Sequence, residues 1–335
     1  MNIKYFHSLL TGALFLLLSG PLLAQIVLPP VPVKPPRVNL PDPIVIPNLN
    51  RPFVEVWAQL PQIGRAVKVK VKPEGNNYIL EGDIILVPRQ IVSTGSQRPS
   101  MEEEFRTREQ GLFGITNVTL GNEYLWLWNY GRVPYTFHSS MTESLKRRVR
   151  DAIAQLERES EGYLRFYPRT NQADYVQFIY RSDMGSSAGR SKLGRIGGRQ
   201  TKELSGTISQ GSIIHEMLHT AGVYHEQSRP DRDEYVRIAW QNIEDGKEDN
   251  FGSWTQEIMG KMYTPYDYGS IMHYYIHAFG VTRNGTKQQT IYPRGGYAGQ
   301  IGNRRGLSDL DKAGLKRMYS RQKWYISEDG TGQWT

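Results

Sequence analysis

The sequence predicts a fold that contains both helices and strands, because strand-like and helix-like runs follow one another after about residue 117. Two runs of β-forming residues, 133–137 and 174–180, have the length and composition of strands. The segment between them carries apolar residues at helical spacing on one face: Leu145, Val149, Ile153 and Leu156. This helix is expected to pack on a sheet.

The first helix is predicted to begin at residues 140–143, whose Ser-Met-Thr-Glu sequence has the capping-box pattern. A second apolar helical run extends from Ser212 to Ala221 and stops at Gly222, a residue type that adopts the left-handed conformation found at helix ends. Upstream, residues 53–87 alternate in short runs, with a turn sequence at 74–77. A small β-rich segment is expected there.

Residues 1–24 have the features of a secretory signal peptide. Lys4 supplies a positive start, residues 13–18 form an apolar run, and cleavage is predicted after Ala24. A retained membrane anchor is the alternative, but the apolar run is shorter than the roughly 20 residues of a spanning helix. The protein is therefore expected to be secreted or periplasmic, without stable membrane insertion.

Composition divides the rest of the chain. Residues 25–52 are rich in proline and are expected to form an extended linker. Residues 88–116 are polar and charged, which predicts a solvated stretch that proteases cut easily. The predicted organisation is therefore an upstream segment at 53–116, a main domain at 117–320 and a tail at 321–335.

The net charge is +8 over 335 residues, and a positive charge of this size can indicate an acidic partner such as nucleic acid. Acidic residues are interspersed along most of the chain, and it has neither a recognisable nucleic-acid module nor basic residues interleaved with aromatic ones. A solvated mixed surface is the simpler explanation, so no nucleic-acid partner is expected. The chain has no Cys, which excludes thiol catalysis and thiolate metal ligands.

The central motif is a pair of histidines. His215 and His219 are four residues apart, so on a helix they stand one turn above each other and can face one zinc ion. His225 is the predicted third ligand, because Gly222 lets the chain turn back towards the ion. Glu216 would lie beside the metal as general base. The alternative is that these histidines are incidental residues of the helix. The chain has only seven His, which argues against this spacing arising by chance.

These residues and their continuation resemble the metzincin metallopeptidases, and Glu226 points to the astacin branch. Residues 225–233, His-Glu-Gln-Ser-Arg-Pro-Asp-Arg-Asp, are similar to the continuation of the family motif, and residues 270–274, Ser-Ile-Met-His-Tyr, are similar to its Met-turn. The other similar stretches are 121–126, 133–135 and 307–311. The resemblance covers residues 117–320.

The resemblance implies an α+β fold with a two-lobed catalytic domain, in which a twisted mixed sheet and two long helices lie above the cleft and an irregular lobe lies below it. It implies a zinc-dependent endopeptidase that acts on peptide or protein substrates. Met272 would lie beneath the metal, and Tyr274 would be an additional ligand that swings to stabilise the transition state. The alternatives are core filling for Met272 and a buried, hydrogen-bonded tyrosine at position 274.

The resemblance also implies a latent precursor. Residues 80–84, Leu-Glu-Gly-Asp-Ile, resemble the Phe-x-Gly-Asp motif of astacin prosegments, with Leu replacing Phe. Asp83 would then bind zinc in the zymogen only, in the place of the catalytic water, and residues 53–116 would be the protein's own inhibitory prosegment. A surface turn is the alternative interpretation of this sequence.

Activation is expected to create a new N-terminus near Asn117, and the resemblance implies that Glu226 then pairs with its amine. The alternative for Glu226 is an ion pair with Arg229 or Arg232. Both interpretations follow from the need of a buried carboxylate for a cationic partner.

Residues 190–202 carry five positive charges before the next acid, Glu203. The family has this segment beside the cleft, which suggests the hypothesis of a preference for acidic substrate side chains, with a solvated basic loop as the alternative. Animal astacins have two disulfides, and the matching positions hold residues such as Tyr163, Met184 and Thr207 here. The shape of residues 182–205 therefore stays open.

Two other function classes are alternatives: a catalytically inactive zinc-containing binding module, and a binder of nucleic acid or acidic surfaces. Glu216 argues against the first, because an inactive relative is expected to lose its base. No pattern in the sequence specifies a natural substrate or an oligomeric state.

Overall fold

The computed structural model describes residues 53–58, 60, 66–86, 90–95, 97, 127–184, 188–253 and 262–320, and the backbone of 324–326 and 332–334. The predicted signal peptide, the proline-rich linker and the stretch around Asn117 lie outside the described residues. Within the described ranges, no helix has both the length and the apolar character needed to cross a membrane.

A ten-stranded mixed sheet organises most of this structure. Its strands in chain order are β1 (Val54–Ala58), β2 (Val67–Glu74), β3 (Asn77–Leu80), β4 (Ile84–Leu86), β5 (Ile91–Ser93), β6 (Arg132–Phe137), β7 (Arg165–Pro168), β8 (Tyr175–Tyr180), β9 (Gly189–Lys192) and β10 (Arg199–Leu204). Their order across the sheet is β5-β1-β2-β3-β4-β9-β10-β8-β6-β7. The strands predicted at 133–137 and 174–180 are confirmed as β6 and β8.

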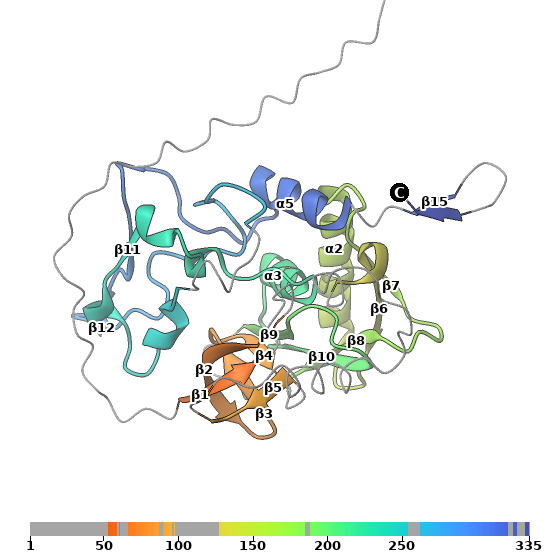
Figure 1. Ribbon diagram of the computed structural model, residues 1–335, viewed down its shortest axis with the longest axis horizontal. Coiled ribbons are helices and arrows are strands. Elements are labelled where there is room, and N and C mark those ends of the chain that lie inside the picture. Colours follow the sequence, from red (N-terminus) through yellow and green to blue (C-terminus); the bar gives the residue numbers. More distant parts are fainter. Residues whose placement is uncertain are drawn as a thin grey trace, which may run out of the picture. The chain divides into compact units, whose positions relative to one another are not determined.

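The upstream segment supplies half of the sheet (Figure 1). Strands β1 to β5 pair antiparallel, and β4 then joins β9 in parallel, with Ile84 opposite Ser191. Alternation along β2 places its three valines in a core and its three lysines outside, which confirms the β-rich segment. The prediction of a solvated stretch from residue 88 onward is wrong at residues 91–93, because these residues form β5, which pairs with β1.

Two helices pack together against the second half of the sheet. Helix α2 (Glu143–Glu159) contacts helix α3 (Gln210–Thr220) and β7, while α3 contacts β9. The apolar face predicted for the first helix is confirmed, since all four of its predicted residues are buried: Leu145, Val149, Ile153 and Leu156. These helices and the mixed sheet form the expected upper lobe.

The predicted capping box at the start of α2 is wrong. The N-cap is Thr142, whose side chain accepts a hydrogen bond from the Leu145 backbone N–H. Ser140 instead accepts a hydrogen bond from the Tyr180 backbone N–H at 3.1 Å, at the end of β8. A tertiary contact therefore takes the hydroxyl that the local pattern assigned to the helix.

The lower lobe is irregular, as the resemblance implied. It contains short 3₁₀ turns and two-stranded pairs: β11 (Val236–Ile238) with β14 (Ile291–Pro293), and β12 (Thr282–Arg283) with β13 (Thr286–Lys287). Its separate core is rich in tyrosine. Helix α5 (Asp309–Tyr319) closes the domain, and the tail beyond it contains the hairpin β15 (Trp324–Ile326) and β16 (Gly332–Trp334).

The basic segment 190–202 is not a solvated loop, because it forms β9 and β10. Arg190 pairs with Glu74 of the upstream segment at 2.5 Å, and Arg195 pairs with Asp174 at 3.1 Å. The side chain of Lys202 is fully buried. Five positive charges facing a cleft are therefore not found, and the acidic-substrate hypothesis loses its basis.

Candidate metal centre

Helix α3 presents two histidines to one point. Its N-cap is Ser209, which accepts a hydrogen bond from the Ser212 backbone N–H. The surrounding helix is almost wholly buried because its other faces carry apolar residues, so the imidazoles of His215 and His219 are shielded from solvent. The two rings lie 4.7 Å apart between centroids. The predicted spacing of one helical turn is confirmed.

The end of α3 brings the third histidine back. Gly222 has φ +95°, a left-handed value that its missing side chain allows. Its N–H donates to the His219 carbonyl at 2.9 Å, and the Val223 N–H donates to the Leu218 carbonyl at 3.0 Å. These two bonds form a Schellman turn. The chain then reverses and places His225 opposite the helix, as predicted from Gly222.

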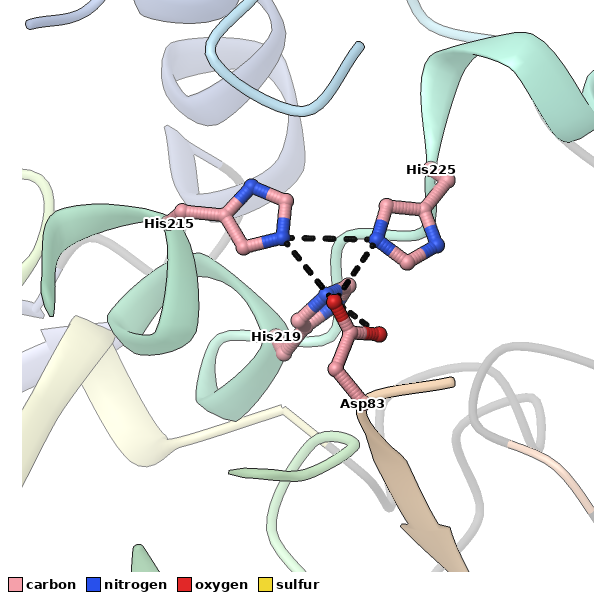
Figure 2. A group of neighbouring side chains, drawn as sticks. All are labelled: Asp83, His215, His219 and His225. Atoms are coloured by element: carbon pink, nitrogen blue, oxygen red, sulfur yellow. Dashed lines mark hydrogen bonds and ion pairs between the residues drawn. The ribbon is translucent and has the colours of Figure 1, made fainter. Parts of the chain in front are cut away.

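Asp83 completes a group of four ligand atoms (Figure 2). The atoms from Asp83, His215, His219 and His225 all lie within 4.8 Å of one another. The His225 Nε2 atom is 3.3 Å from Asp83 and 3.3 Å from His215 Nε2, and the contacts of Asp83 with the other two histidines are 3.5 and 3.7 Å. Ligands at about 2.1 Å from a tetrahedral zinc stand about 3.4 Å apart. The observed spacings match that geometry.

Hydrogen bonds from the outer ring nitrogens fix the orientation of the three imidazoles. His215 Nδ1 contacts the Ile271 carbonyl at 2.9 Å, His219 Nδ1 the Val223 carbonyl at 2.8 Å, and His225 Nδ1 the Glu81 carboxylate at 2.6 Å. Each Nδ1–H donates outward, so each Nε2 atom faces the centre of the group, where it can bind a metal. A carboxylate and three ring nitrogens that face one point favour a cation there. The residues present therefore fit a zinc ion.

Electrostatics in the group agree with this fit. Burial lowers the pKa of His215 to about 4 and that of His219 well below its usual value, so both imidazoles are neutral. Burial also opposes protonation of His225, but the carboxylates of Asp83 and Glu81 outweigh it and raise the pKa of His225 to about 10. The same two carboxylates would stabilise a metal cation here.

Glu216 follows His215 on α3 and is buried. Among the described residues, no hydrogen-bond partner is found for its Oε2 atom, nor for His219 Nε2 and Asp83 Oδ1. Burial, and then the charge of Asp83, raise the pKa of Glu216 to about 8. A buried carboxylate with a free oxygen beside a metal group is suited to accept a proton.

Residues 270–274 contact the group from a separate segment of the chain. Met272 is buried in the same hydrophobic core as the apolar residues of α3, and the carbonyl of Ile271 accepts a hydrogen bond from His215. The position of Met272 beneath the metal stays a prediction. Tyr274 lies next to His225, with 4.8 Å between ring centroids, and its hydroxyl donates to the Glu81 carbonyl at 2.6 Å. Burial raises the pKa of Tyr274 well above its usual value, so the phenol stays neutral. Its role as an additional metal ligand stays a prediction.

Two supporting residues were not predicted. Glu81 holds both His225 and Tyr274, and its backbone adopts φ +51° in the turn between β3 and β4. The turn predicted as an alternative for residues 81–83 does exist, but it is inserted at the metal group rather than at the surface. Arg304 donates to the Ile271 carbonyl at 2.6 Å, the same carbonyl that holds His215. Adjacency to Asp83 was the only sequence signal for Glu81.

Glu226 lies beyond the metal group, at a cavity of about 120 Å³ that Arg229 and Asp311 also line. It pairs with Arg229 at 3.2 Å and accepts a hydrogen bond from the Asp267 N–H at 2.8 Å. Burial raises the pKa of Glu226 to about 8, although Arg229 opposes the change. The alternative pairing with Arg229 is thus present here, and the stretch around Asn117 lies outside the described residues.

Three histidines on a helix and its return turn leave a fourth position for which Asp83 and a solvent molecule would compete, as in mononuclear hydrolytic metal centres. The comparisons with known proteins agree with that class. The chain belongs to the astacin family of peptidases, whose family model, described as Astacin, matches residues 121–320.

Individual relatives support the assignment. The chain is 36% identical over 212 residues to zinc metalloproteinase nas-13 of Caenorhabditis elegans, an alignment that covers 63% of this chain and 44% of that protein. It is 31% identical over 207 residues to human meprin A subunit beta, covering 62% and 28%. It therefore spans less than half the length of these relatives. The structure of high choriolytic enzyme 1, a hatching enzyme zinc-protease from Oryzias latipes, matches with a TM-score of 0.52 and 30% identity, over 61% of this chain and 99% of that one.

Proposed function

We propose that this protein is a secreted zinc-dependent endopeptidase that is made as a latent precursor. The observation that carries the proposal is the group of three Nε2 atoms around one point, each fixed by an outward Nδ1 bond, with the unpartnered carboxylate oxygen of Glu216 beside it. Named zinc metalloproteinases among the relatives support zinc as the metal. The substrates would be peptides or proteins.

His215, His219 and His225 would hold the zinc ion, which when bound polarises a carbonyl and lowers the pKa of water. Glu216 accepts the proton of the attacking water and later delivers it to the leaving amine. The Tyr274 hydroxyl, once released from Glu81, donates a hydrogen bond to the developing oxyanion.

Latency would rest on the upstream segment. Asp83 lies 3.3 Å from His225 Nε2, where a fourth ligand would bind. The Glu81 carbonyl accepts a hydrogen bond from the Tyr274 hydroxyl, which keeps that hydroxyl from other partners. Strand β4 also covers β9, so an extended substrate could not add to that strand. These contacts support residues 53–116 as an inhibitory prosegment. A signal peptide ending at Ala24 would direct the precursor out of the cytoplasm.

We expect the active form to begin near Asn117, with its amine paired to Glu226. Glu226→Gln should then destabilise the active form by about 3–5 kcal/mol, because it leaves a buried amine without an anionic partner. The precursor should lose less stability, since in that form Arg229 still pairs with Asp231 at 2.9 Å. N-terminal sequencing and thermal unfolding of both forms provide the measurement. An active form that begins far from residue 117, or an equal loss in both forms, contradicts the pairing.

Casein hydrolysis by the activated protein, with and without a metal chelator, tests the function itself. We expect hydrolysis that the chelator abolishes. A folded, zinc-loaded protein that binds casein without cutting it would instead be the inactive binding module.

A further inference from the structure

A lysine is buried directly beneath the metal-binding helix. Lys202 lies on β10 with an exposed fraction of 0%, and its Nζ donates to the Ser191 hydroxyl at 2.7 Å and to the main-chain carbonyl of Glu216. Ser191 lies opposite Lys202 on β9, and its hydroxyl contacts the Thr220 hydroxyl at 3.0 Å, at the end of α3. The lysine thus joins two strands to the helix at the position of Glu216.

Packing alone does not account for this residue. Other neighbours on this part of the sheet, such as Phe178 and Leu204, are apolar and fully buried. An apolar side chain would fill the same space, whereas a buried ammonium group is costly unless polar partners receive it. Burial lowers the pKa of Lys202 to about 7, and Glu216 is the charged group that opposes the shift. The ammonium group is received by the Ser191 hydroxyl and the Glu216 main-chain carbonyl.

A second contact holds Glu216 from β9. Gly189 lies so close that a Cβ atom there would be 2.6 Å from Glu216 Cγ and 2.9 Å from Oε1. The side chain of Glu216 therefore passes over Gly189, while its main chain is held by Lys202 on the neighbouring strand. All these residues belong to the main domain, so removal of the upstream segment leaves the contacts in place.

We propose that Lys202 is a positioning residue for the general base: it fixes the peptide carbonyl of Glu216 so that the carboxylate keeps one orientation over Gly189. This inference rests on the proposed peptidase function. Lys202 does not touch the reacting atoms, so it acts only through Glu216.

The test is Lys202→Met in the activated protein, because Met has a similar length and no charge. We expect kcat to fall about 10- to 100-fold, the range that a displacement of about 1 Å in a catalytic group produces. KM and the zinc content of one per chain should stay unchanged. Arg199→Met is the matched control, because Arg199 is an exposed cation on the same strand, and it should keep the wild-type kcat.

A wild-type kcat in Lys202→Met, even with reduced thermal stability, would reduce Lys202 to a structural role and overturn the inference. If Lys202→Met does not fold, Ser191→Ala decides, since it removes one acceptor of the ammonium group with a minimal change in volume. A lower kcat at unchanged KM supports the inference, and an unchanged kcat overturns it. Glu216→Gln measured in parallel separates the two proposals: if it keeps activity, the peptidase mechanism itself fails.

Discussion

Asp83→Ala should make the uncleaved, full-length precursor hydrolyse a short peptide substrate. The carboxylate of Asp83 lies 3.3 to 3.7 Å from all three histidine Nε2 atoms, so its loss opens the fourth ligand position to water. We expect activity at least about 10-fold above that of the wild-type precursor. Strand β4 still covers β9, so the rate should stay below that of the cleaved enzyme.

Intact mass measured before and after the assay shows that no cleavage has occurred. Glu55→Ala is the matched control, because Glu55 is an exposed acid on β1 that pairs only with Lys68 among the ion pairs described. It should remain latent. If Asp83→Ala is folded and zinc-loaded but inactive, Asp83 is not the switch.

Glu216→Gln should retain zinc and lose hydrolysis by about 10²–10⁴-fold or more, because an amide has the shape of the carboxylate but cannot take the proton of the attacking water. The three histidines keep their outward Nδ1 bonds in this variant, so metal affinity should not fall. Metal analysis and single-substrate kinetics on the activated protein provide the measurement.

Glu203→Gln offers a matched control, since Glu203 is also buried but lies on β10 beside Arg181 at 3.5 Å. It should keep the wild-type rate. Unchanged turnover in Glu216→Gln with full zinc content would remove Glu216 from the mechanism.

The metal group was predictable because its geometry is local. His215 and His219 share a helical face, and Gly222 ends that helix with a turn of known form, so the place of His225 follows from one short stretch of consecutive residues. The apolar face of α2 was predictable for the same reason. Asp83 was identified from a family motif, since nothing within its own segment indicates which histidines it meets.

Contacts between distant segments were not predictable from local patterns. Strand β4 is separated by about a hundred residues from β9, and no periodicity encodes their pairing. The run of basic residues suggested a solvated loop, whereas the sheet buries Lys202 and pairs Arg190 with Glu74. The tertiary contact that takes the Ser140 hydroxyl moves the helix cap to Thr142. In each case burial and long-range pairing decided the outcome.

Zinc titration of the metal-free, activated protein tests the central claim most directly. Hydrolysis should be absent before zinc is added and should reach its maximum at one equivalent per chain, because one group of three histidines binds one ion. His219→Ala should fail to regain activity under the same conditions, while His277→Ala, at an exposed histidine outside the group, should match the wild type. Full hydrolysis by the folded protein without metal would contradict the account.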